Sequence, residues 1–214
     1  MSTHDIDDGT GGLDASIKYE LDRAQNVGVG MEASLVDFAD FQAPLFSMSD
    51  LIALGVVLGV AACGGPIISY SGGRVDATVA GPETVPEPQQ DLATHIVESF
   101  RLQGFNVTEM INLVACAHTL GGVRQVDFPL IVTDNEVEVA TFDTTVAFDN
   151  VVVSQYLQNT TENVLVVDPN VTTRSDFRIF SSDGNETMQR CAWALFNNSV
   201  ALKLSTPVFI HRNV

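Results

Sequence analysis

The chain has 214 residues, of which 45% are hydrophobic and 17% charged, enough to bury the core of one medium-sized domain. Its 27 Asp and Glu residues outnumber its 10 Lys and Arg residues, which gives a formal net charge of −17. Nucleic acids and anionic membrane surfaces would repel such a chain, so we expect no nucleic acid and no membrane among its partners. The charge fits a protein that works in a mildly acidic medium.

In the first half of the chain, apolar spacing predicts two helices separated by loops. The first helix is expected over residues 15–26, after an acidic, glycine-rich loop. The second begins at Ser47, a residue type that caps helix N-termini, and contains the apolar run 51–62. A bilayer span needs roughly 20 residues, so this run predicts a buried core helix and no membrane anchor. Residues 67–90, rich in proline and glycine, predict an irregular connection.

The second half continues the helical pattern. Apolar residues at helical spacing predict one helix over 90–102 and another that starts at the cap Thr108 and ends near His118. Val-rich alternation in 123–150 leaves a short hairpin and irregular loops as alternatives, and two short helices are expected over 151–158 and 188–197. The fold class is therefore mainly α, with long irregular loops.

Two features of the sequence point in opposite directions on where in the cell the protein is sent. The polar, acidic first residues lack the basic start and apolar stretch of a signal peptide, which leaves a cytoplasmic location open. Asn-x-Ser/Thr acceptor sites are nevertheless more frequent than composition predicts, and they matter only on a secretory route. A loop composition rich in Thr and Asn is the alternative, but we favour secretory ancestry. The acceptor sites are Asn106, Asn159, Asn170, Asn185 and Asn197.

His118 is the first candidate for chemistry. It lies on the apolar face of its predicted helix, where a lone histidine is more often a satisfied core residue than a ligand. An imidazole on an apolar wall would also suit a haem iron or a zinc ion. Zinc needs further ligands nearby, and the three cysteines lack metal-site spacing. The alternatives that remain are a core histidine and an axial haem ligand.

Residues 114–122, Val-Ala-Cys-Ala-His-Thr-Leu-Gly-Gly, resemble the proximal-histidine signature of the plant, fungal and bacterial haem peroxidase superfamily. The closest resemblance is to its fungal secreted, class II members. Further segments agree in order and spacing between about residues 9 and 196: 49–54, 63–66, 73–77, 85–88 and 175–177. The resemblance implies a haem-peroxidase fold in which His118 is the axial iron ligand. It also implies that Asp176 accepts the ring's other proton, which gives the imidazole imidazolate character.

The resemblance also implies two calcium sites, because the matching residues offer the oxygen ligands that a hard cation prefers. Ordinary acidic turns are the alternative. The distal set is Gly12, Asp14 and Ser16, and the proximal set is Thr119, Asp143, Thr145 and Asp149. In the proximal set the two aspartates are one residue closer together than in the family pattern.

The distal side departs from the family. A helix with Arg and then Phe-His-Asp normally precedes the segment with which this sequence opens, and His4-Asp5 is a poor substitute for it. The catalytic residues are therefore unknown. The family's C-terminal tail is also unmatched after Phe196. We expect a single peroxidase-like domain over 1–214 that lacks the distal helix and this tail. Peroxidase turnover should be no more than a trace, since losing a positioned acid/base lowers the rate about 10²–10⁴-fold.

Three functions follow as hypotheses. The first is a peroxidase frame redeployed, with or without a cofactor, to cyclise, isomerise or perform a cycloaddition on a small hydrophobic molecule in fungal secondary metabolism. The second is a secreted haem peroxidase that oxidises phenolic molecules with hydrogen peroxide and whose distal part is absent from this chain. The third is a non-catalytic haem-binding protein. A visible absorption spectrum of the purified protein separates the haem hypotheses from a haem-free one.

Overall fold

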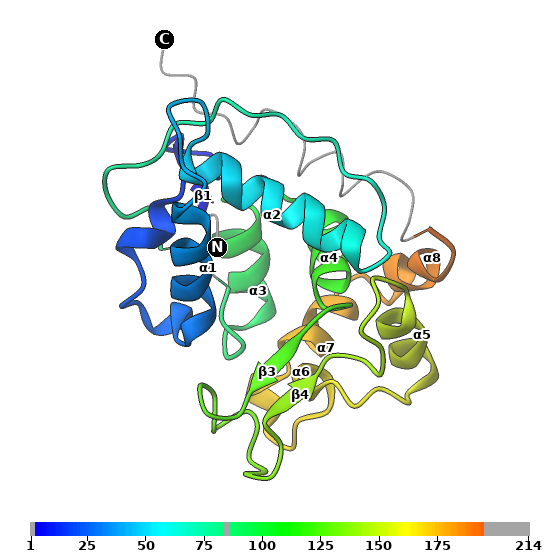
Figure 1. Cartoon of the computed structure of the whole chain (residues 1–214). Coiled ribbons are helices and arrows are strands. Elements are labelled where there is room, and N and C mark those ends of the chain that lie inside the picture. Colours follow the sequence, from blue (N-terminus) through cyan, green and yellow to red (C-terminus); the bar gives the residue numbers. More distant parts are fainter. Residues whose placement is uncertain (1–2, 84–85, 195–214) are drawn as a thin grey trace.

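Helices make up most of the regular secondary structure of the described residues, as the sequence predicts (Figure 1). The structure is a computed structural model that describes residues 3–83, here called the first half, and 86–194, the second half. Each half contains one small antiparallel sheet: β1 (His4–Asp5) pairs with β2 (Thr10–Gly11), and β3 (Gly122–Arg124) pairs with β4 (Val139–Thr141). Among the described residues, no helix is both long and apolar enough to cross a membrane.

Two short helical turns follow the β1–β2 sheet in the first half. These are η1 (Ser16–Tyr19) and η2 (Ala24–Asn26), so the continuous helix predicted over 15–26 is wrong. The buried carboxylate of Glu20 explains the break. It accepts a hydrogen bond from the Gly81 backbone N–H and pairs with Arg23, and these contacts attach the chain to a distant loop. A third element, α1 (Val29–Ala39), was not predicted; it packs against α2 (Met48–Ala62) and contains no buried residue.

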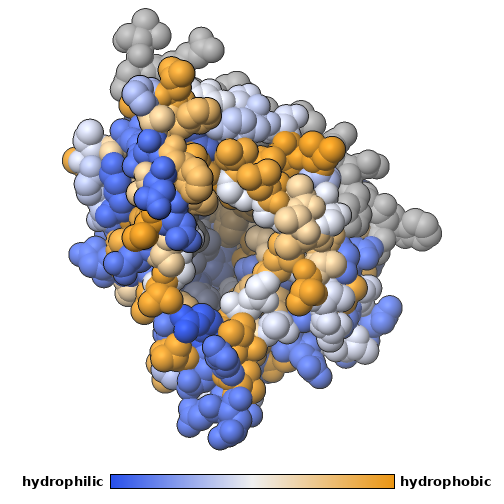
Figure 2. All heavy atoms as spheres, viewed as in Figure 1, coloured by the Kyte–Doolittle hydropathy of each residue, from blue (hydrophilic) through white to orange (hydrophobic). Residues whose placement is uncertain are grey.

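α2 begins where the sequence predicts, with the Ser47 hydroxyl accepting a hydrogen bond from the Asp50 backbone N–H. It is not the buried core helix expected over 51–62, because its buried residues end at Ala53. Farther along, the side chains of Val56 and Leu58 are 47% and 59% exposed. Figure 2 shows apolar side chains at the surface over α2. A helix that is apolar all round needs partners on every side, and the described residues cover α2 only in part.

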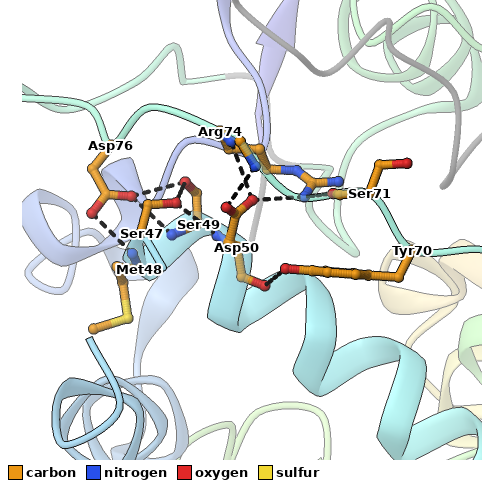
Figure 3. A network of polar contacts seen from close by, with 9 residues as sticks. Ser47, Met48, Ser49, Asp50, Tyr70, Ser71, Arg74 and Asp76 are labelled. Carbon is orange, nitrogen blue, oxygen red and sulfur yellow. Dashed lines mark hydrogen bonds and ion pairs between the residues drawn. The ribbon is translucent and has the colours of Figure 1, made fainter. Parts of the chain in front are cut away.

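Polar contacts fix the start of α2 to the irregular connection that follows it (Figure 3). The Asp76 carboxylate accepts hydrogen bonds from the Met48 and Ser49 backbone N–H groups at 3.0 and 2.8 Å. The Asp50 carboxylate, whose side chain is 2% exposed, pairs with the Arg74 guanidinium at 2.9 Å. These two aspartates hold the predicted irregular segment in place, and its described residues, 67–83 and 86–90, lack helices and strands.

The main core lies in the second half and is centred on α4 (Val107–Ala117). This helix packs against α7 (Ser175–Phe180) and α8 (Glu186–Ala194), and α8 also packs against α5 (Val151–Gln158). The prediction that α4 is buried is confirmed. Its cap is Asn106 and not Thr108, because Asn106 and Glu109 form a reciprocal capping box. The fully buried side chains of this core include Met110, Ile111, Val153, Phe180 and Met188.

Smaller elements complete the second half. The helix predicted over 90–102 is present as α3 (Leu92–Thr94), which continues into the π-helical segment η3 (His95–Phe100). The β3–β4 hairpin confirms the hairpin alternative for 123–150, and α5 has the predicted bounds. α8 starts two residues earlier than predicted, while the predicted end at 197 lies outside the described residues. Two short elements, α6 (Val164–Val167) and η4 (Val171–Thr173), precede α7.

Candidate functional site: a histidine–aspartate pair on an apolar cavity

A cavity of about 690 Å³ lies where η2, the loop 86–89 and the helices of the second half meet. Figure 2 shows the viewed face hollowed near its centre. The cavity falls within the size range of small-molecule and cofactor sites, which are typically apolar with a few placed polar groups. Its apolar lining includes Val27, Phe100, Val123, Phe128, Ile131, Phe142 and Ile179.

His118 and Asp176 meet at the wall of this cavity, and both line it. His118 follows the last turn of α4, and Asp176 lies in the first turn of α7. The ring Nδ1 lies 2.7 Å from Asp176 Oδ2. Since a carboxylate oxygen accepts, Nδ1 is the donor, and the lone pair of the neutral ring lies on Nε2. The prediction that these side chains lie within hydrogen-bonding distance is confirmed.

The two partners differ in burial. The Asp176 side chain is 1% exposed, whereas that of His118 is 24% exposed. Phe142 stacks against the imidazole with 4.0 Å between ring centroids and 18° between ring planes. The imidazole is thus held by a carboxylate at one edge and an aromatic ring on one face, with its Nε2 lone pair left for a ligand.

Asn163 is a third member of the site that the sequence analysis missed. Its Nδ2 donates a hydrogen bond to Asp176 Oδ2 at 2.8 Å, and its side chain is fully buried. Its Oδ1 accepts from the Leu165 backbone N–H, which caps α6. In the sequence, Asn163 stands before an apolar run, a pattern that is typical of a helix cap. That pattern does not reveal the contact with Asp176.

His95 is the other described histidine that lines the cavity, and it too was not singled out. The ring is fully buried at the start of η3, with Nε2 2.9 Å from the Glu87 carbonyl oxygen, so Nε2 carries the proton. Burial lowers the pKa of His95 below its usual value, which keeps the ring neutral. This geometry fixes the loop 86–89 to η3.

Arg178 attaches the same loop to α7 from the other side. Its guanidinium donates hydrogen bonds to the backbone carbonyls of Pro88 and Gln90, and also to those of Val171 and Thr172. Burial lowers the pKa of Arg178, but a guanidinium remains protonated in proteins. The loop at the cavity is therefore joined to the helix that carries Asp176.

The structure brings the four proximal calcium candidates together. The Thr145 hydroxyl lies 3.1 Å from both Asp143 Oδ1 and Asp149 Oδ2, and the Thr119 hydroxyl donates to the Asp149 carbonyl at 2.9 Å. Asp143 is 6% exposed, and its Oδ2 is buried without a hydrogen-bond partner. An unpartnered carboxylate oxygen among hydroxyl and carboxylate oxygens fits a hard cation. The calcium assignment itself stays a prediction.

The distal calcium candidates include one carboxylate, whereas the proximal candidates include two. Gly12, Asp14 and Ser16 follow one another in a turn, where Asp14 Oδ1 accepts from the Ser16 backbone N–H. The Ser16 hydroxyl is buried without a partner, so one oxygen remains for a cation. Within the part of the chain that the structure describes, no group of three or more His, Cys, Asp and Glu residues is placed to hold a metal.

His4, the substitute considered for the distal histidine, lies in β1 with Nδ1 bonded to the Thr10 carbonyl at 2.8 Å. It is not among the described residues that line the cavity, and neither is any arginine. The described cavity wall therefore provides the proximal pair with neither His4 nor an arginine beside it.

A helical domain with a histidine–aspartate pair at an apolar cavity defines a haem-peroxidase-like protein, and comparison with known families agrees. The family model "Peroxidase" matches residues 4–204. The chain therefore belongs to the peroxidase family. The finer resemblance to fungal secreted class II members stays a prediction.

Similar proteins come from fungi and plants. A WSC domain-containing protein of Arthroderma benhamiae is 38% identical over 90% of this chain and 27% of its own length. A mitochondrial cytochrome c peroxidase of Yarrowia lipolytica is 36% identical over 53% of this chain and 34% of its own. The peroxisomal L-ascorbate peroxidase 5 of Arabidopsis thaliana is 32% identical over 56% and 43%. The chain thus spans less than half the length of these relatives.

Proposed function

We propose that this domain binds haem in the cavity, with His118 Nε2 as the axial ligand to the iron. The observation that carries the proposal is the 2.7 Å contact between His118 Nδ1 and Asp176 Oδ2 at the wall of an apolar cavity. If His118 were only a core histidine, its ring would not need to be half-buried or to line a cavity. A relative from Yarrowia lipolytica that is named a putative heme-binding peroxidase supports the same cofactor.

The chain's own residues prepare the ligand. Asp176 accepts a hydrogen bond from Nδ1 and so favours one tautomer of the ring, in which Nε2 would be the nitrogen that holds the iron. Phe142 supports one face of the ring, and the apolar lining would limit the access of water to a bound haem. When bound, haem supplies one-electron and peroxide chemistry. Small phenolic or hydrophobic molecules would then be its reductants.

A second candidate function is the redeployed enzyme, which cyclises, isomerises or performs a cycloaddition on a small hydrophobic molecule, as in fungal secondary metabolism. The apolar lining favours it, because the same cavity would then hold the substrate itself and orient its reacting atoms. This candidate needs no iron. His118 and Asp176 would then serve only the fold. A non-catalytic haem-binding protein is the third candidate and shares the haem site of the first.

A haem titration tests the proposal. Added haemin should produce a Soret band of one-to-one stoichiometry in the wild type, and His118→Ala should abolish it. Asp176→Asn should weaken haem affinity about 10–100-fold, since it removes the charge that supports the ligand. His4→Gln is the matched control, because His4 does not line the cavity, and should bind as the wild type does. Equal binding by wild type and His118→Ala would overturn the haem assignment.

We also propose that the proximal set around Asp143 binds calcium, supported by the unpartnered Asp143 oxygen. The distal set around Asp14 is proposed as a weaker site. Calcium at 100 times its dissociation constant would stabilise the fold by about 2.7 kcal/mol. Asp143→Asn should remove most of this gain. A melting temperature that calcium and chelator leave unchanged would contradict the proposal.

We further propose a secretory route with glycosylation. Three acceptor asparagines are exposed (Asn106, Asn159 and Asn170), Asn185 is half-buried, and Asn197 lies outside the described residues. The side-chain oxygens of Asn106 and Asn170 accept hydrogen bonds, which leaves Nδ2 for the glycan. Passage through a eukaryotic secretory pathway should add mass that peptide N-glycosidase removes. No added mass would contradict it.

A further inference from the structure

Two strong donors converge on a single oxygen of Asp176. His118 Nδ1 approaches Oδ2 at 2.7 Å, and Asn163 Nδ2 approaches the same atom at 2.8 Å. The other carboxylate oxygen meets only the Ser175 hydroxyl at 3.4 Å, a long contact. The Asp176 carboxylate therefore shares its negative charge between two hydrogen-bond donors, His118 and Asn163.

The orientation of the Asn163 amide is settled by its neighbours. Its Oδ1 must face the Leu165 backbone N–H, which only donates, and its Nδ2 must face the Asp176 carboxylate, which only accepts. Reversing the amide would place two donors together and two acceptors together. Since the side chain is fully buried, no water competes for these contacts.

We propose that Asn163 is a positioning residue that acts on the haem ligand through Asp176 by drawing part of the carboxylate's charge away from His118. This rests on the proposed haem function. A carboxylate that accepts from two donors on one oxygen attracts each proton less strongly than one that accepts from a single donor. Asn163 thereby keeps the imidazole closer to neutral and limits its imidazolate character. Partners of this kind tune a bound metal as well as orient its ligands.

The sign of the effect separates this role from simple support. If Asn163 shares the charge, its removal strengthens the hydrogen bond between Asp176 and His118 and increases imidazolate character. If Asn163 only holds the carboxylate in place, its removal loosens that hydrogen bond and decreases imidazolate character. The two roles predict opposite shifts of the same observables.

The test uses haem-loaded protein and two spectroscopic readouts, the iron–histidine stretching band of the ferrous form and the ferric/ferrous reduction potential. Asn163→Leu has a side chain of similar size without the amide. We expect its stretching band to move to higher frequency and its potential to become more negative. Asn163→Ser, a smaller change that keeps an oxygen near the Leu165 N–H, should shift both in the same direction.

Asn170→Ala is the matched control. Asn170 caps the neighbouring element η4 through the Thr172 N–H and makes no contact with Asp176, so both readouts should equal those of the wild type. Unchanged values, or a shift to lower frequency and higher potential in both Asn163 variants, would overturn this inference alone. A wild type that binds no haem would overturn the proposed function, and this inference with it.

Discussion

α2 and α4 are both apolar helices with side-chain caps at their N-termini, yet they differ in how much of their apolar surface is buried. α4 buries Met110 and Ile111 completely in the main core, whereas α2 leaves Val56 and Leu58 at the surface. α2 is attached instead through charged groups at its first turn, where Asp50 meets Arg74 and Asp76 accepts backbone N–H groups (Figure 3). The comparison teaches that the number of apolar residues does not decide burial. The available partners decide it.

The largest expected difference between the two halves is in stability after truncation of a large side chain. Phe180→Ala empties a fully buried position beside Tyr156, and should lower the free energy of unfolding by about 3–5 kcal/mol. Leu58→Ala in α2 should change it by no more than about 0.5 kcal/mol. Urea unfolding of the two variants measures both. Comparable losses would show that α2 is covered in solution.

The polar attachment of α2 is the second target. Arg74→Met leaves the Asp50 carboxylate, 2% exposed, without its cation, and should cost about 3 kcal/mol in the same unfolding experiment. Arg101→Met removes an exposed partner of Asp7 and serves as the control, for which no measurable loss is expected. If the two variants have the same free energy of unfolding, the contact between Arg74 and Asp50 does not stabilise the attachment of α2.

Helix caps sharpen the comparison on a smaller scale. Asn106→Ala removes the capping box of α4 and should destabilise the fold by about 1 kcal/mol. Ser47→Ala removes the side-chain cap of α2, but Asp76 still accepts from the first N–H groups of that helix. We therefore expect a smaller loss from Ser47→Ala. Urea unfolding midpoints of the two variants measure these losses. A lower midpoint for Ser47→Ala than for Asn106→Ala would contradict the expected order.

Cysteine reactivity gives the smallest effect. Cys63, at the end of α2, and Cys116 are half-buried and Cys191 is buried. Desolvation raises the pKa of Cys116 to about 12 and that of Cys191 to about 11. Thiolates react, so a maleimide at pH 8 should label Cys63 first in the native protein. The stability that comes from the raised pKa values of Cys116 and Cys191 is fully present below their unfolded pKa near 8.5 and falls as the pH rises toward 12. Mass spectrometry of labelled peptides checks the order.

The sequence predicted most of the second half and part of the site. Amphipathic spacing found α4 and α5, and the resemblance found His118 and Asp176, because both signals are local. α1 and the exposure of α2 were missed, since burial depends on which segments come together in three dimensions. Asn163 was missed for the same reason. Its contact with Asp176 joins residues 13 positions apart, and no local pattern encodes it.

Arg178 gives the cavity loop an attachment that acid does not release. Its partners are backbone carbonyls, which do not titrate, and the guanidinium stays charged at any pH that a protein meets. Attachments that need an ionised carboxylate weaken as the medium becomes acidic. The contacts of Arg178 with this loop therefore depend less on acidity than a carboxylate contact such as that of Asp50 with Arg74.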